Sequence, residues 1–372
     1  MRRIAVAAVL LLGASTPLHA GLFDNITGGE KPKRVELTTG SDKTAVFRDI
    51  FAGVGPFASE VKPAELAVRK VAIAAFQIEF VTQHIAVAGQ KGGLGGGGLE
   101  KTFTLKGVSD EQQLAITESL HQQFKDLLVQ RGYEIVPAEA LLSSSFKSEL
   151  SNAEGAALRK DEKDGVLGSA RSIGLIGRNS GDTHSGSVVV TARGTAPRVF
   201  DVKFGLPSAM VLADEMGIAV VQVRLQANFM QIDTSNEALF SLAEAEGKPR
   251  NMLAKQGSQV SVFWPGSKMA QFIVNKSLLL PGSVGGAVTE LAMTSGEKAG
   301  AGAKIALSAL GGFFGGGGGR GGLAQAAGDL GGTLGSIAGS GKFEVTADAD
   351  YQTKLLQDLG LVIGVYAEAL PR

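Results

Sequence analysis

The sequence predicts an α+β fold in which helices pack on a mixed β-sheet. Residues 70–81 combine an apolar run with alternation, as a largely buried strand does. Residues 109–131 carry apolar side chains at helical spacing, and further strand and helix patterns alternate along the rest of the chain. Hydrophobic residues make up 44% of the 372 residues, which is enough for a sizeable core.

The N-terminus has the pattern of a secretory signal peptide. Arg2 and Arg3 precede an apolar run at residues 4–13, and a cleavage point is expected after Ala20. The run is shorter than the ~20 residues that a membrane-spanning helix needs. We therefore expect a periplasmic or secreted protein. After the signal peptide we expect an exposed lead-in at residues 21–69, with a short helix at 43–52.

A glycine-rich segment lies between two extended stretches after the first strand. Residues 84–87 continue the extended pattern of residues 70–81, residues 92–98 are mostly glycine, and residues 101–105 alternate again. This order predicts a β-hairpin with a long, mobile glycine tip.

The helix at 109–131 has a defined beginning and end. Ser109 is a good N-cap residue, and Gln112 three residues later completes a capping-box pattern. Gly132 is the expected stop. A short strand at 133–136 and a second helix from Pro137 to about Leu150 are expected to follow.

The remaining pattern continues the alternation of strands and helices. Residues 151–186 are polar, and the mixed-sign charge cluster at 159–164 fits a solvated loop. Beyond them we expect strands at 187–191, 218–232, 260–264, 271–280 and 343–345, and helices at 206–216 and 350–369. The domain is thus expected to span residues 70–295, with residues 342–372 completing it after a low-complexity segment at 296–341 that contains 18 glycines.

Composition excludes several kinds of chemistry. Without residues 1–20 the chain has 34 basic and 36 acidic residues, so no excess of positive charge points to nucleic acid. The chain has no cysteine, which excludes disulfides, thiolate metal sites and the lipid-modified cysteine of a bacterial lipoprotein.

Three stretches together resemble the α/β fold of the TolB amino-terminal domain and of the curli-export channel family. They are the strand at 70–76, the helix–glycine–strand step at 127–136 and its repetition at 212–221. They cover about a third of the chain. The glycine-tipped hairpin and the missing cysteine depart from the family pattern. The resemblance implies an envelope-assembly or accessory module and carries over no functional residues.

Three glycine patterns superficially match nucleotide-binding motifs. Gly93, Gly95 and Gly98 satisfy GxGxxG, but no helix opens after them; the match at 316–321 follows no convincing strand. In the segment ending at Lys342, Ser336 replaces the first P-loop glycine and Phe343 replaces the hydroxyl that would hold Mg²⁺. We expect no cofactor.

The three histidines outside the signal peptide do not form a zinc motif. His84, His121 and His184 are far apart in sequence, and no HExxH is present. His184, in a polar segment, is the best candidate for a catalytic residue, although no GxSxG elbow accompanies it.

Glycines recur every four residues inside the glycine-rich segment. In a helix this spacing forms a groove that allows close helix–helix contact, whereas glycine costs ~1 kcal/mol per helical position relative to alanine and favours a disordered linker. Candidate residues for membrane contact or self-association are Gly311, Gly315, Gly319, Gly331, Gly335 and Gly339.

Three functional hypotheses follow. The first is a non-enzymatic exported module that binds another envelope protein. The second is a protein that associates with itself or with the membrane periphery through residues 296–341. The third is a hydrolase that uses His184 with a carboxylate. No nucleic-acid partner is expected.

Overall fold

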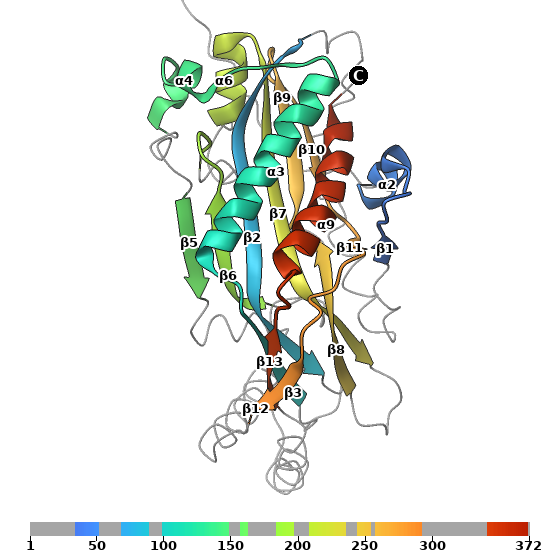
Figure 1. The fold of residues 1–372 in the computed structure, drawn as a ribbon. Coiled ribbons are helices and arrows are strands. Elements are labelled where there is room, and N and C mark those ends of the chain that lie inside the picture. Colours follow the sequence, from blue (N-terminus) through green and yellow to red (C-terminus); the bar gives the residue numbers. More distant parts are fainter. Residues whose placement is uncertain are drawn as a thin grey trace, which may run out of the picture.

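The computed structural model describes residues 34–51, 68–88, 99–148, 157–162, 184–196, 208–235, 244–253, 257–291 and 341–370. It confirms the predicted fold class, because these residues form one mixed sheet with helices packed on it (Figure 1). The strands are β1 (Arg34–Glu36), β2 (Lys70–Ala88), β3 (Leu99–Lys106), β4 (Glu134–Ile135), β5 (Ala157–Glu162), β6 (His184–Thr191), β7 (Ala219–Ser235), β8 (Glu244–Leu253), β9 (Gln259–Trp264), β10 (Lys268–Ile273), β11 (Ser277–Leu279), β12 (Val288–Leu291) and β13 (Gly341–Thr346). The helices are α2 (Lys43–Ile50), α3 (Asp110–Gln130), α4 (Ala138–Leu141), α6 (Ser208–Met216) and α9 (Tyr351–Tyr366), with short 3₁₀ segments at Ser145–Ser148 and Ala367–Ala369.

The two longest strands form the centre of the sheet. β2 and β7 pair in parallel from Val71↔Ala219 to Phe80↔Ala227. The main order of strands is β1-β11-β8-β7-β2-β3-β13-β12, while β6 pairs with residues 77–84 of β2 and β9 pairs with residues 220–224 of β7. The apolar, β-branched sequences of β2 and β7 suit a position with neighbours on both sides.

Helices α3 and α9 lie side by side on one face of the sheet (Figure 1). The predicted capping box is present at the beginning of α3, where Ser109 accepts from the Gln112 N–H and the Gln112 side chain accepts from the Ser109 N–H. The predicted stop is also present, since Gly132 has φ +84°. The apolar face of α3 is buried against the sheet through Ile116, Leu120, Phe124 and Leu128.

The opposite face of the upper sheet carries a smaller apolar cluster. Side chains alternate across a strand, so β2 directs Val71 and Ile73 toward the large core and Ala72 and Ala74 toward the small one. Helix α6 packs over β7 and β9 on this face, and its buried residues Ala209, Met210, Leu212 and Ala213 belong to the same cluster as these alanines.

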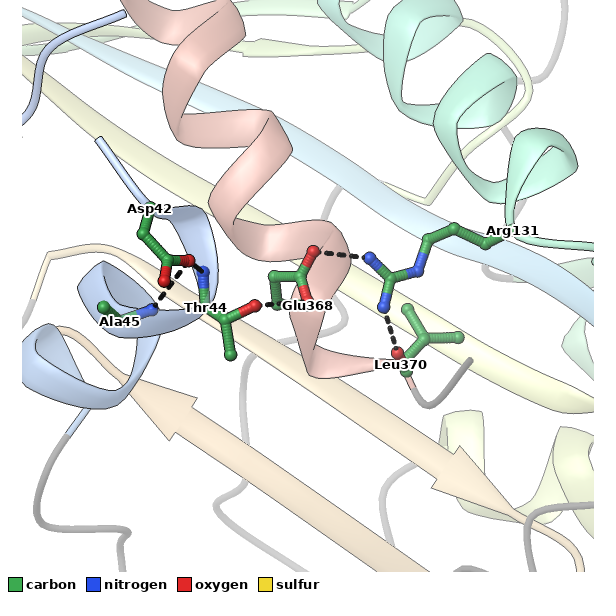
Figure 2. A network of polar contacts seen from close by, with 6 residues as sticks. All are labelled: Asp42, Thr44, Ala45, Arg131, Glu368 and Leu370. Atoms are coloured by element: carbon green, nitrogen blue, oxygen red, sulfur yellow. Dashed lines mark hydrogen bonds and ion pairs between the residues drawn. The ribbon is translucent and has the colours of Figure 1, made fainter. Parts of the chain in front are cut away.

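The C-terminal helix is joined to two other elements by one polar network (Figure 2). The guanidinium of Arg131, after α3, donates to Glu368 Oε1 over 2.7 Å and to the Leu370 carbonyl over 2.9 Å. The other carboxylate oxygen of Glu368 accepts from the Thr44 hydroxyl on α2 over 3.2 Å. The network thus connects α2, α3 and the end of α9, and the predicted strand and helix at 343–369 are confirmed.

Residues 34–51, expected to belong to an exposed lead-in at 21–69, join the sheet and its core, and the short helix expected at 43–52 is confirmed as α2. β1 pairs in parallel with β11, and α2 is capped by the Asp42 carboxylate. Ile50 and Phe51 are buried, with Phe51 against Phe272 of β10. Aromatic packing against residues distant in the chain holds this segment, and the local pattern alone does not reveal it.

The helix expected from Pro137 to about Leu150 is also wrong in length. It ends at Leu141, and a 3₁₀ segment follows. The hydroxyls of Ser143 and Ser144 donate to the carbonyls of Ala140 and Leu141 at 2.8 and 2.6 Å. Such hydroxyl–backbone bonds compete with regular helix formation.

Three strand expectations need correction. The polar loop expected at 151–186 contains β5 and the beginning of β6. The single strand expected at 271–280 is divided into β10 and β11, which pair with different neighbours, because the Val274 N–H bonds to Ser258 and the Asn275 N–H to Ile50. Strands β8 and β12 were not expected.

Candidate functional site

Three antiparallel pairs of strands end together at one end of the sheet (Figure 1). They are β2–β3, β7–β8 and β12–β13, whose last paired residues are Ala88↔Leu99, Ser235↔Glu244 and Leu291↔Lys342. We call this region, formed by β3, β12, β13 and the adjoining ends of β2, β7 and β8, the hairpin end. The predicted hairpin at 70–105 is confirmed, while its glycine tip lies outside the described residues.

At the hairpin end, the two strands that directly follow the glycine-rich segments of the sequence lie next to each other. Strand β3 begins at Leu99, directly after the glycine run at 92–98, and β13 begins at Gly341, directly after the second segment. β3 and β13 are parallel neighbours, with Gly341 opposite Lys101. The chain therefore enters both strands side by side. The candidate residues Gly311, Gly315, Gly319, Gly331, Gly335 and Gly339 themselves lie outside the described residues.

Aromatic and basic side chains meet on one face of β3 and β13. The rings of Phe103 and Phe343 are stacked, with centroids 5.1 Å apart. The ammonium group of Lys101 lies 5.9 Å from the Phe343 ring centroid, within range of a cation–π interaction. On the other face Lys106 and Glu344 form an exposed ion pair at 3.6 Å. Phe103 is buried and Phe343 is partly buried, so this face borders solvent.

Strand β12 forms the outer edge of the hairpin end. Among the described strands it pairs with β13 alone, and all four of its residues are exposed. Val288 is 43% exposed and Leu291 is 37% exposed. An open strand edge offers backbone N–H and C=O groups to another strand, so it is a natural site for strand addition.

The chain before β12 is held against the end of β13 and the turn that follows it. The Thr346 N–H donates to the Ala287 carbonyl and the Asp348 N–H to the Val284 carbonyl, both over 3.2 Å. A side chain on Gly286 would overlap the Thr346 carbonyl oxygen, which is backbone and cannot rotate away. Gly286 is therefore required for β12 to reach β13.

Replacing Gly286 by alanine is expected to lower the free energy of unfolding by about 1–3 kcal/mol through this overlap. Hydrogen exchange should show loss of protection in β12 and β13, while α3 remains protected. Gly40, beside which a Cβ would meet no atom within 4 Å, supplies the matched control as Gly40→Ala. Equal protection of β12 in both variants would contradict this role of Gly286.

His184 does not lie in a loop as expected, but is the first residue of β6. Its backbone is paired opposite His84 of β2. The carboxylate of Glu79, which is buried on the same pair of strands, is level with Val189, five residues farther along β6. At about 3.3 Å per residue this places the two backbones ~16 Å apart along the sheet. The structure therefore does not pair His184 with Glu79, and the acidic residue nearest to it in the strand register is Glu162 of β5, whose backbone is opposite Gly186.

His121 lies on the core side of α3. Its ring is 5.2 Å from that of Phe76, and it is 6% exposed. Burial and, to a smaller extent, the nearby charge of Lys125 lower the pKa of His121 to about 4. His121 is thus a neutral residue of the core and is not part of a candidate ligand site.

A polar group that was not predicted lies across the middle of the sheet. Glu79 accepts from the Ser187 hydroxyl and from Arg224, each over 2.9 Å. The sequence signal was present in the polar residues Gln77 and Glu79 that alternate with apolar ones in β2. The carboxylate is nearly buried whereas Arg224 reaches solvent, so the group neutralises a buried charge between three strands.

Searches for metal and membrane sites were limited to the same described segments. Within them, no group of three or more His, Asp or Glu residues could hold a metal ion. No helix there has both the length and the hydropathy needed to span a bilayer.

Comparison with known proteins gives no relatives. No protein family, no curated protein and no solved structure matches this chain.

Proposed function

We propose that this chain is an exported, non-enzymatic module that binds another protein of the cell envelope through its hairpin end. The observation that carries this proposal is β12, whose four residues are exposed and which is paired on one edge alone among the described strands. Strand addition gives affinity through the backbone and specificity through neighbouring side chains. The partly buried Phe343 and the neighbouring Lys101 supply such side chains beside the edge.

The signal-peptide pattern at residues 1–20 and the resemblance to the TolB amino-terminal domain and the curli-export channel family support the same proposal. Both favour an assembly or accessory role in the periplasm or outside the cell. A protein with that role acts through a surface, which agrees with an exposed strand edge more readily than with a reactive cluster.

The partner is tested by capture from crosslinked envelopes with the purified chain as bait. Leu291→Arg places a charge on the β12 edge, and Val129→Arg makes the same change at a 55% exposed position on α3. We expect Leu291→Arg to lose the captured protein at least tenfold and Val129→Arg to retain it. Equal capture by both variants would exclude the hairpin end as the binding surface, and detection of the chain with residues 1–20 in the cytosol would exclude export.

The second candidate function is self-association or peripheral membrane contact through the glycine-rich segment at 296–341. It is favoured by the parallel pairing of β3 and β13, which joins both glycine-rich segments to the sheet at neighbouring strands. Deleting residues 296–340 should then shift the chain to a smaller oligomer or release it from the membrane fraction. Unchanged oligomer size and fractionation would eliminate this function.

A further inference from the structure

Among the described strands, the edge of β12 that faces away from β13 has a defined set of unpaired backbone positions. The Ala287 carbonyl accepts from the Thr346 N–H of β13, and residues two apart in an antiparallel strand point their backbone groups to the same side. Thr289 and Leu291 therefore direct their groups toward β13, whereas Val288 and Glu290 direct theirs outward. These two residues determine how another strand can be added.

A second copy of β12 satisfies these positions in one register only. Two copies can pair antiparallel around a two-fold axis that is perpendicular to the sheet. The two sheets then form one continuous sheet, with corresponding faces on the same side, only when some residue lies directly opposite its own copy. An axis at Glu290 places two carboxylates directly opposite each other, which is unfavourable. An axis at Val288 or Leu291 pairs fewer of the four strand residues.

An axis at Thr289 meets each requirement. Val288 of one copy is then opposite Glu290 of the other, so both outward-facing residues form hydrogen-bonded pairs. Thr289 lies opposite its own copy in a non-hydrogen-bonded pair, where threonine–threonine contacts are favourable. The exposed side chain of Leu291 lies opposite Ala287 of the second copy, which covers apolar surface that is open in the single chain.

We propose that β12 is the interface of a homodimer, in which two copies join their sheets antiparallel with Thr289 on the two-fold axis. This inference rests on the proposed role of the hairpin end as a binding surface; it names a second copy of the chain as an occupant of β12, which would compete for this edge with the envelope protein proposed above. The interface involves only residues 287–291 of each copy, so the dimer is weak and forms at high local concentration.

The absence of cysteine from the sequence allows a direct test. Cα atoms of a non-hydrogen-bonded pair are about 4.5 Å apart, within the 4.4–6.8 Å range of disulfides. Under mild oxidation, the purified Thr289→Cys chain should form a linked dimer at least tenfold faster than Glu290→Cys, whose sulfurs face different residues, or Val129→Cys on α3. Adding Val288→Pro, which removes an outward N–H, should abolish the link while the circular dichroism spectrum remains unchanged.

Two results would overturn the proposal. The first is linkage of Thr289→Cys no faster than Val129→Cys; the second is equal linkage of Thr289→Cys and Glu290→Cys, which indicates random collision or another register. If linkage fails while Leu291→Arg still loses an envelope protein, β12 binds a different chain, and the proposed function stands without the homodimer. If both fail, the hairpin end is not a binding surface.

Discussion

Replacing Glu368 by alanine is expected to lower the free energy of unfolding by about 3–5 kcal/mol, because it leaves a largely buried guanidinium without its carboxylate. The side chains of Arg131 and Glu368 are 13% and 12% exposed, and their closest atoms are 2.7 Å apart. The substitution also removes the acceptor of the Thr44 hydroxyl, so α2 should loosen from α9 (Figure 2). Urea unfolding followed by circular dichroism measures the effect.

The control is Glu344→Ala, which breaks an ion pair with Lys106 in which both partners are at least one-third exposed. Its effect should remain within about 1 kcal/mol. The double variant Arg131→Met/Glu368→Leu should recover much of the lost stability, because it removes both charges together. If the double variant is as unstable as Glu368→Ala, the loss of stability comes from lost packing and hydrogen bonds and not from an unpaired buried charge.

Acidification is expected to destabilise the fold through His121, by about 2 kcal/mol between pH 7 and pH 5 and by about 3 kcal/mol near pH 4. The folded-state pKa of about 4 is lower than the ordinary value of 6.5, so the folded state binds the proton less readily than the unfolded state. The stabilisation is fully present above pH 6.5 and is lost as the pH falls toward 4.

The variant His121→Leu, with no titrating group beside Phe76, should show a smaller loss of stability over this range than the original chain. Gln130→Leu changes an exposed residue of the same helix and should leave the pH dependence as it was. Chemical unfolding at half-unit steps from pH 7 to pH 4 provides the comparison. Identical slopes for the original chain and His121→Leu would contradict a neutral, buried His121.

The elements that the sequence predicted well are those with local signals. Ser109 and Gln112 define the beginning of α3, and Gly132 and Gly217 adopt the positive φ values that end α3 and α6. Residues 70–81 and 218–232 are long enough and apolar enough to be recognised as central strands. In each case the information lies within a few neighbouring residues.

The elements that it missed depend on contacts between distant residues. β8 contains Lys248 and Pro249, a pattern typical of a loop, yet it pairs with β7 over its length. Pro249 is tolerated because β11 pairs only with Met252 and Leu253, so no strand described on that side needs its N–H. β12 is exposed throughout and has no periodicity to detect.

The candidate site could not be predicted from the sequence either, because it also depends on contacts between distant residues. The glycine-rich segments were recognised as unusual, but nothing local indicates that Lys101 and Gly341 lie opposite each other. The open edge of β12 is a property of the assembled sheet. The polar neighbours of His184, in contrast, predict a loop, but His184 and the residues that follow it form β6.

The position of β13 has a consequence for how the chain acquires its structure. This strand is inserted between β3 and β12, and α9, which follows it, supplies Leu355, Leu359, Val362 and Ile363 to the large core. Residues 341–370 are therefore needed before the sheet and its core can close. A chain emerging from the ribosome would expose apolar surface until β13 and α9 have been synthesised. Parallel pairing between β3 and β13, which are more than 200 residues apart in the sequence, also forms slowly. A chaperone that binds unfolded chains would therefore find this chain unfolded until β13 and α9 are available.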